Sequence, residues 1–172
     1  MKKILKTVLP LVAIFAISCL VTGCWLYSFS GTSIQPDVKT ICIEPVQNRA
    51  LKVNPTLANS LYEALSDKYR KLTRLEQVED AGDLYVLCTI EGYDVSATAI
   101  TADEVAAKNR LTVSVKVKFV NEKYPEENFE QNFAGYEDYD SERSLDEVEA
   151  TLCDTILEKI VEDIFNATVA NW

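Results

Sequence analysis

Residues 111–119 read LTVSVKVKF, and this stretch is the most informative part of the sequence for the fold. Apolar and polar residues alternate through it with a period of two, which is typical of a strand that buries one face and exposes the other. The apolar row consists of Leu111, Val113, Val115, Val117 and Phe119, and the polar row consists of Thr112, Ser114, Lys116 and Lys118.

Three further strands are predicted on either side of this stretch. Residues 84–90 alternate in the same way, and Gly92 marks a bulge where that strand bends. Residues 129–136 form a strand that we expect to run antiparallel to 111–119, because the charged turn that joins the two strands is short. Residues 38–46 (VKTICIEPV) form the first strand of the main domain and are largely buried.

Two amphipathic helices complete the pattern. Asn54 and Pro55 are suited to cap and begin the first helix, and S-x-x-E at residues 144–147 fits a capping box before the second. The second helix reaches about 25 residues and ends near Asn171 and Trp172. The predicted buried stripes are Leu57, Leu61, Leu65, Tyr69 and Leu72 in the first helix, and Leu145, Val148, Leu152, Ile156, Ile160, Ile164 and Phe165 in the second.

The predicted fold class is therefore α+β. The order is strand, helix, three strands, helix, and each helix has one apolar stripe. We expect both helices to pack on one face of a four-stranded mixed sheet.

The N-terminus has the pattern of a bacterial lipoprotein signal. Basic residues are followed by an apolar segment that is too short for a comfortable membrane span, and Val21-Thr22-Gly23-Cys24 closes it as a lipobox. We expect residues 1–23 to be removed and Cys24 to be lipidated, which anchors the protein to a membrane without spanning it. The alternative is an ordinary cleaved signal that leaves Cys24 as a free thiol.

The predicted organisation is a signal peptide at 1–23, a lipidated N-terminal segment at 24–36 and a single α+β domain at 37–172. Trp25, Tyr27 and Phe29 follow the predicted lipid site with a period of two. This aromatic run suits a short strand, although it also fits contact with a bilayer interface or a partner.

Composition excludes several classes of function. The predicted signal holds three of the 17 basic residues and none of the 27 acidic residues, so the mature chain has a formal charge of −13 and is not a general nucleic-acid binder. The chain contains no histidine, the commonest general base and the commonest zinc ligand. Cys42, Cys88 and Cys153 are far apart and lie in apolar segments, so buried core thiols are favoured over a disulfide.

No constellation of catalytic groups is recognisable. The chain has no G-x-S-x-G motif and no glycine-rich phosphate loop, and its acidic residues fit a solubilising surface. We therefore predict that the protein is not an enzyme and that it binds no metal or other cofactor.

Five stretches carry a resemblance to LptE, the lipoprotein of lipopolysaccharide assembly, in the form found in Bacteroidetes-type bacteria. They run from Tyr27 to Trp172 and so cover nearly the whole mature chain. Their specificity lies in their combination and order. They read YSFSGTSIQPDVKTICIEP (27–45), NRALKVNPTLANSLYEAL (48–65), ITADEVAAKNRLTVSVKVKF (100–119), FEQNFAGYEDYDS (129–141) and VEDIFNATVANW (161–172).

The resemblance implies an outer-membrane lipoprotein with two helices against a four-stranded sheet. It implies that the protein plugs the large β-barrel LptD, helps that barrel to fold and assists the passage of lipopolysaccharide to the cell surface. No acidic run follows Cys24, which favours retention on the periplasmic side of the membrane. The polar exterior expected of a plug agrees with the composition.

The resemblance also implies contact with lipopolysaccharide, although no motif assigns residues to it. Our candidates are Lys108, Arg110, Lys116 and Lys118, since both side-chain types bind phosphate. The alternative is a solvated sheet face on which nearby glutamates balance these charges. The alternative function is a free-standing lipoprotein binding module for glycan or peptide, with Tyr85, Tyr93, Tyr136 and Tyr139 as its binding face.

Overall fold

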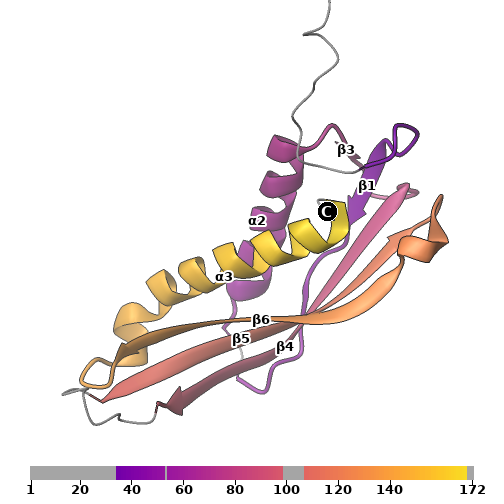
Figure 1. Ribbon diagram of the computed structural model, residues 1–172. Coiled ribbons are helices and arrows are strands. Elements are labelled where there is room, and N and C mark those ends of the chain that lie inside the picture. Colours follow the sequence, from indigo (N-terminus) through magenta and orange to yellow (C-terminus); the bar gives the residue numbers. More distant parts are fainter. Residues whose placement is uncertain (1–33, 53, 99–106, 170–172) are drawn as a thin grey trace, which may run out of the picture. The chain divides into compact units, whose positions relative to one another are not determined.

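The computed structural model describes residues 34–52, 54–98 and 107–169, all within one compact unit, Thr32–Trp172. The predicted signal, Cys24 and the aromatic run lie outside these residues. The elements in chain order are β1 (Thr40–Ile43), β2 (Gln47–Asn48), α2 (Leu57–Leu72), β3 (Glu76–Gln77), β4 (Leu84–Ala97), β5 (Lys108–Asn121), the 3₁₀ turn η2 (Pro125–Glu127), β6 (Phe129–Asp140) and α3 (Leu145–Val169) (Figure 1).

The sheet is mixed, as predicted, and has the order β3-β1-β4-β5-β6. β4, β5 and β6 form an antiparallel meander, and β1 and β2 both pair with β4 in parallel. The antiparallel pairing predicted for residues 129–136 is therefore confirmed. α2 and α3 lie on the same side of the sheet (Figure 1), which confirms the two-layer α+β class.

The number of strands differs from the prediction, since the described sheet has six strands and not four. The two additional strands, β2 and β3, contain two residues each. The predicted strand 38–46 is shorter, because the chain leaves β4 after Ile43 and rejoins it at Gln47. Pro45 lies in this gap and has no N–H to donate to a neighbouring strand.

α2 begins at Leu57 with Thr56 as its N-cap, so the predicted start, with Asn54 as the cap and Pro55 as the first helical residue, is wrong. Asn54 Oδ1 nevertheless accepts hydrogen bonds from the backbone N–H of Thr56 at 3.0 Å and of Leu57 at 3.2 Å, in the turn that leads into the helix. The predicted stripe is buried from Leu57 to Tyr69. Leu72 is 48% exposed, because the helix ends there and the chain turns away to β3.

α3 contains 25 residues, which matches the predicted length, and its last described residue is Val169. It lies over β6 and β5 (Figure 1) and packs tightly against Gly135 of β6. A Cβ on Gly135 would lie 3.0 Å from Ile156 Cγ2 and 3.2 Å from the backbone oxygen of Ile156. A residue without a side chain therefore sets the distance between the helix and the sheet.

One hydrophobic core lies between the helices and the sheet. The inward row of β5 is at most 2% exposed, and Tyr69 of α2 contacts Phe165 of α3 with ring centroids 5.3 Å apart. The predicted bulge is present in β4, where the register with β5 shifts between Ile90 and Gly92. Cys42, Cys88 and Cys153 are free and buried, as favoured from the sequence. Of the helices in the described ranges, none has both the length and the apolar character to cross a bilayer.

Candidate functional site

The four predicted cationic residues lie on one face of β5, and we call them the cationic row: Lys108, Arg110, Lys116 and Lys118. The buried residues of β5 occupy the alternate positions, so the row points away from the core. The row consists of two separated groups, because Lys116 lies six positions after Arg110, which is about 20 Å along a strand. We call these groups the two ends of the row. The face that carries it has no described helix over it (Figure 1).

Arg110 belongs to a three-residue arrangement between β5 and β6. Its Nε and Nη2 donate to the two carboxylate oxygens of Asp138 at 2.7 Å and 2.9 Å, and its guanidinium carbon lies 3.9 Å from the centre of the Tyr136 ring. This bidentate hydrogen bonding lowers the pKa of Asp138 and raises that of Arg110. Tyr136 is 52% exposed, so the stacked pair faces solvent.

Lys116 and Lys118 lie beside a second carboxylate of β6. Lys116 Nζ is 2.5 Å from Glu130 Oε1, and hydrogen bonding to Lys116 is the main cause of the lowered pKa of Glu130. Lys118 pairs in register with Glu130 on β6 and with Leu87 on β4, and its charge also lowers the pKa of Glu130. Lys108 pairs in register with Asp140 at the other end of the row.

The structure therefore brings the predicted site residues onto one face and also supplies each end with acidic neighbours. An anion that binds Lys116 or Arg110 must compete with a carboxylate that is already in place. This arrangement suits a ligand with several phosphates better than a single inorganic ion, since each ion pair that is displaced has to be replaced.

Of the four tyrosines proposed as a binding face, Tyr93 and Tyr139 are buried, at 4% and 8% exposure. Tyr93 is the inward residue of β4 after the bulge, and its hydroxyl donates to Glu149 of α3. Tyr85 is half-buried and Tyr136 is exposed. The predicted tyrosine face is therefore wrong, because the alternation of the strands places two of its four members in the core.

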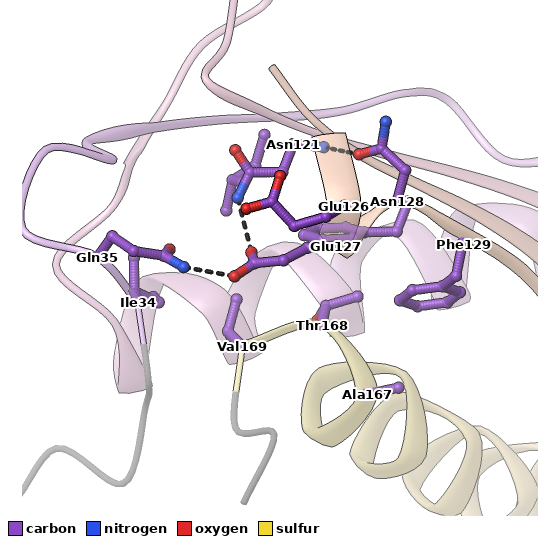
Figure 2. A pocket seen from close by; sticks show the side chains of 12 residues that line it. Ile34, Gln35, Asn121, Glu126, Glu127, Asn128, Phe129, Ala167, Thr168 and Val169 are labelled. Atoms are coloured by element: carbon purple, nitrogen blue, oxygen red, sulfur yellow. Dashed lines mark hydrogen bonds between the residues drawn. The ribbon is translucent and has the colours of Figure 1, made fainter. Parts of the chain in front are cut away.

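A cavity of about 370 Å³ lies between the end of α3 and the turn that joins β5 to β6 (Figure 2). Its polar groups bond to one another. Asn121, which is 1% exposed, donates from Nδ2 to Glu127 Oε2 at 2.8 Å, and Gln35 Nε2 donates to the other oxygen of Glu127. Asn128 Oδ1 accepts from the backbone N–H of Asn121 at 2.6 Å. These bonds hold the first described residues against the β5–β6 turn, and we therefore assign the cavity a structural role.

Asp83 makes a second polar junction at the same end of the sheet. Its carboxylate accepts from the backbone N–H of Lys39 at 2.7 Å and of Thr40 at 3.2 Å, and Lys123 Nζ lies 3.0 Å away. These contacts, chiefly the one with Lys39, lower the pKa of Asp83 to about 2. Asp83 thus joins the start of β1 to the start of β4. No three metal-ligating side chains converge within the part of the chain that the structure describes.

The sequence alternative to a phosphate site was a face balanced by glutamates, and Glu130 beside Lys116 confirms one such partner. Sequence reasoning did not identify which acids pair with the row, and it missed both junctions. Glu130 and Asp138 become partners only through the register of β5 with β6. Their spacing could have indicated this, because an even number of positions separates Glu130 from Asp138 and so places both on the outward face of β6. The junction at Asp83 had no periodic signal, since Asp83 comes just before β4 and outside its alternating residues.

Comparison with known proteins places these features in a family. The model of the family LptE, described as lipopolysaccharide-assembly, matches residues 38–168. No curated protein matches the chain. Among solved structures, the chain is similar to a hypothetical protein from Chlamydia trachomatis, with 11% identity, a TM-score of 0.51, and coverage of 77% of this chain and 99% of that one. It is also similar to a neuraminyllactose-binding hemagglutinin homologue from Helicobacter pylori, with 12% identity, a TM-score of 0.53, and coverage of 74% and 84%. At these identities the two structures share the fold with this chain.

Proposed function

Because the chain belongs to the LptE family of lipopolysaccharide-assembly lipoproteins, we propose that it plugs a large LptD-like β-barrel in the outer membrane. In this proposal it also helps that barrel to assemble and assists the transport of lipopolysaccharide to the cell surface. The family match from residue 38 to residue 168 carries the proposal, because it covers every strand of the described sheet and nearly all of α3.

The shape and surface of the domain support a plug. A wide barrel leaves an open, polar lumen, so an object inside it needs a compact core and a charged exterior. The described unit has one hydrophobic core, and its outer sheet face carries the cationic row with acidic partners. A face of this kind can exchange its own ion pairs for ion pairs with a polar barrel wall.

The anchor belongs to the same proposal. Removal of residues 1–23 and acylation of Cys24 place the protein on the periplasmic side of the outer membrane. Ten residues, 24–33, then precede the first described residue, Ile34. An extended chain of that length reaches at most about 35 Å, so the domain stays close to the membrane that holds the barrel.

For lipopolysaccharide itself, we propose that the cationic row contacts phosphates. Lys118 is the most accessible member, since it is exposed and has no ion pair within the described residues. Arg110 offers a planar fork and Lys116 a point charge, once each has released its carboxylate. A headgroup with several phosphates matches the two separated ends of the row.

The experiment is a pull-down of the tagged lipoprotein from gently solubilised outer membranes. We expect a stoichiometric, heat-modifiable large barrel to co-purify. Recovery of the protein alone or with soluble ligands would instead favour the free-standing binding module for glycan or peptide. That result would overturn the plug proposal.

The phosphate contact is tested separately with the double variant Lys116→Glu and Lys118→Glu. We expect its thermal unfolding to match that of the wild type and its binding of purified lipopolysaccharide to weaken. The matched control is Lys52→Glu with Lys71→Glu, which makes the same charge change at exposed residues outside β5. Equal binding by all three proteins would show that the row is not a lipopolysaccharide site.

A further inference from the structure

β6 is a long sheet edge of unusual regularity. It ends the path β3-β1-β4-β5-β6 and pairs with β5 over all twelve residues, from Phe129 to Asp140, without a shift in register. Within the described ranges no strand pairs with its outer edge (Figure 1). Proteins usually protect such an edge with short length, proline, lysine or a bulge. The opposite edge strand, β3, is short, whereas β6 is long, has no proline, lysine or bulge, and carries only acidic charges.

A groove lies beside the middle of β6. It has a volume of about 450 Å³ and is bounded by residues 134–138 of β6 and by Lys159, Glu162 and Asp163 of α3. Ala134 and Gly135 are the smallest residues of the strand. α3 covers Gly135 on the inner face, whereas Ala134 is exposed on the outer face. The edge and the groove together fit an added strand, with backbone hydrogen bonds along the edge and room for its side chains against α3.

The groove is negative on balance, since it is lined by four carboxylates, Glu137, Asp138, Glu162 and Asp163, and by one lysine, Lys159. β6 contains four acidic residues and no basic residue, and α3 contains seven acidic residues and one basic residue, Lys159. Ion pairs with Lys159, Arg110 and Lys68 compensate Glu137, Asp138 and Glu162. Asp163 is the lining acid that has no ion pair within the described residues, so it is the one available to a basic ligand. Even if all four cations of β5 are counted, acidic residues outnumber basic residues eleven to five across β5, β6 and α3.

We propose that the outer edge of β6 binds an extended, basic segment of a partner polypeptide by strand addition. The regular edge supplies backbone donors and acceptors, and the acidic groove selects positive side chains. A second copy of this chain is disfavoured as the occupant, because pairing β6 with β6 would place two acidic surfaces in contact. The inference does not depend on the barrel partnership, since it concerns the edge of the isolated lipoprotein.

The test uses the full-length lipoprotein in non-ionic detergent and a short blocked peptide of alternating lysine and valine. Hydrogen exchange reports where the peptide binds, and fluorescence anisotropy reports its affinity. We expect new protection of amides within Phe129–Asp140 and an affinity that falls as salt is raised. A glutamate–valine peptide should bind at least about 10-fold more weakly, since like charges oppose docking.

Two matched controls separate strand addition from general charge attraction. The same basic peptide with methylated backbone nitrogens keeps its charge but cannot donate to the edge, and it should not protect β6. Asp163→Lys should weaken binding by about 3- to 10-fold. Asp154→Lys should not, because residue 154 lies on the opposite side of the same helix, about 13 Å away along its axis.

Four results would overturn the proposal. Binding that is unaffected by backbone methylation would exclude strand addition. Equal binding of the acidic peptide, or equal effects of the two α3 variants, would exclude selection by charge. A dimer of the lipoprotein with β6 protected in the absence of peptide would identify a second copy as the occupant. If the peptide experiments contradict strand addition, the expected result of the barrel pull-down does not change. The strand-addition proposal and the plug proposal can therefore fail separately.

Discussion

The two faces of β5 differ sharply in burial and charge, although they belong to the same fourteen residues. The inward row from Leu111 to Phe119 is at most 2% exposed and forms the middle of the core. The outward row holds four cations, and two of them, Arg110 and Lys116, form solvent-facing ion pairs with β6. The comparison teaches that one face sets the stability of the domain, while the other is free to change its partners at little cost to folding.

The largest expected difference in stability is between two substitutions at adjacent positions of β5. Val117 is 0% exposed, so Val117→Lys buries a charge in the core and should cost more than about 4 kcal/mol, enough to unfold an ordinary domain. Lys118→Val, one residue away on the open face, should leave the urea midpoint unchanged. Circular dichroism during urea unfolding measures both. Similar midpoints for the two variants would contradict the assignment of the faces.

The next effect concerns the contact of α3 with β6. Gly135→Val places two methyl groups against Ile156 and should cost about 1–3 kcal/mol through overpacking. Ala134→Val, on the opposite face of the same strand, has open space and should stay within about 0.5 kcal/mol. The free energy of unfolding in urea distinguishes them. A neutral Gly135→Val would mean that α3 can move away from the sheet without loss.

A smaller effect, dependent on pH, is expected at Asp83. The folded protein stabilises the carboxylate form, because its pKa is lowered to about 2 from an ordinary value of 3.8. Its contribution to stability is therefore complete above about pH 4 and is lost as the pH falls toward 2. Asp83→Asn should cost about 1–2 kcal/mol at pH 7 and progressively less below pH 4. Urea unfolding across this range measures the difference, and a cost that is independent of pH would show that the charge of Asp83 is unimportant.

The smallest effect is a change in titration on the open face. Arg110 is the main cause of the lowered pKa of Asp138, so Arg110→Gln should raise that pKa toward its ordinary value. Carboxyl chemical shifts during an NMR titration report it directly. Lys159→Gln is the matched control, because Lys159 pairs with the neighbouring Glu137 and not with Asp138. An unchanged pKa in the Arg110 variant would show that the pair does not persist in solution.

Much of the fold could be predicted, because β5 and both helices have a clear period of burial. The alternation at residues 111–119 and the stripe from Leu57 to Tyr69 each arise from local geometry that repeats along the chain. β2 and β3 could not be predicted, since two residues contain no period. Leu72 continued the apolar spacing of α2, but its burial depended on where the helix ended.

The candidate site could be predicted only in part. The residues of the cationic row could be predicted to share one face, because side chains alternate between the two faces along a single strand. That prediction required no knowledge of the tertiary structure. The pairing of Arg110 with Asp138 depends on the exact register between two strands, which the turn at residues 122–128 determines. The cavity beside Asn121 joins three distant segments, and no local pattern indicates such a meeting.

The parallel pairing of β1 also has a consequence for the order in which the chain folds. β4, β5 and β6 are consecutive in the sequence, whereas Ile41 of β1 pairs with Leu84 of β4 across the whole of α2. Contacts that close a long loop form late, so we expect the meander to form before β1 joins it, and pulse-labelled hydrogen exchange can establish this order. β1 would then be the first strand of the described sheet to be synthesised and the last to reach its place.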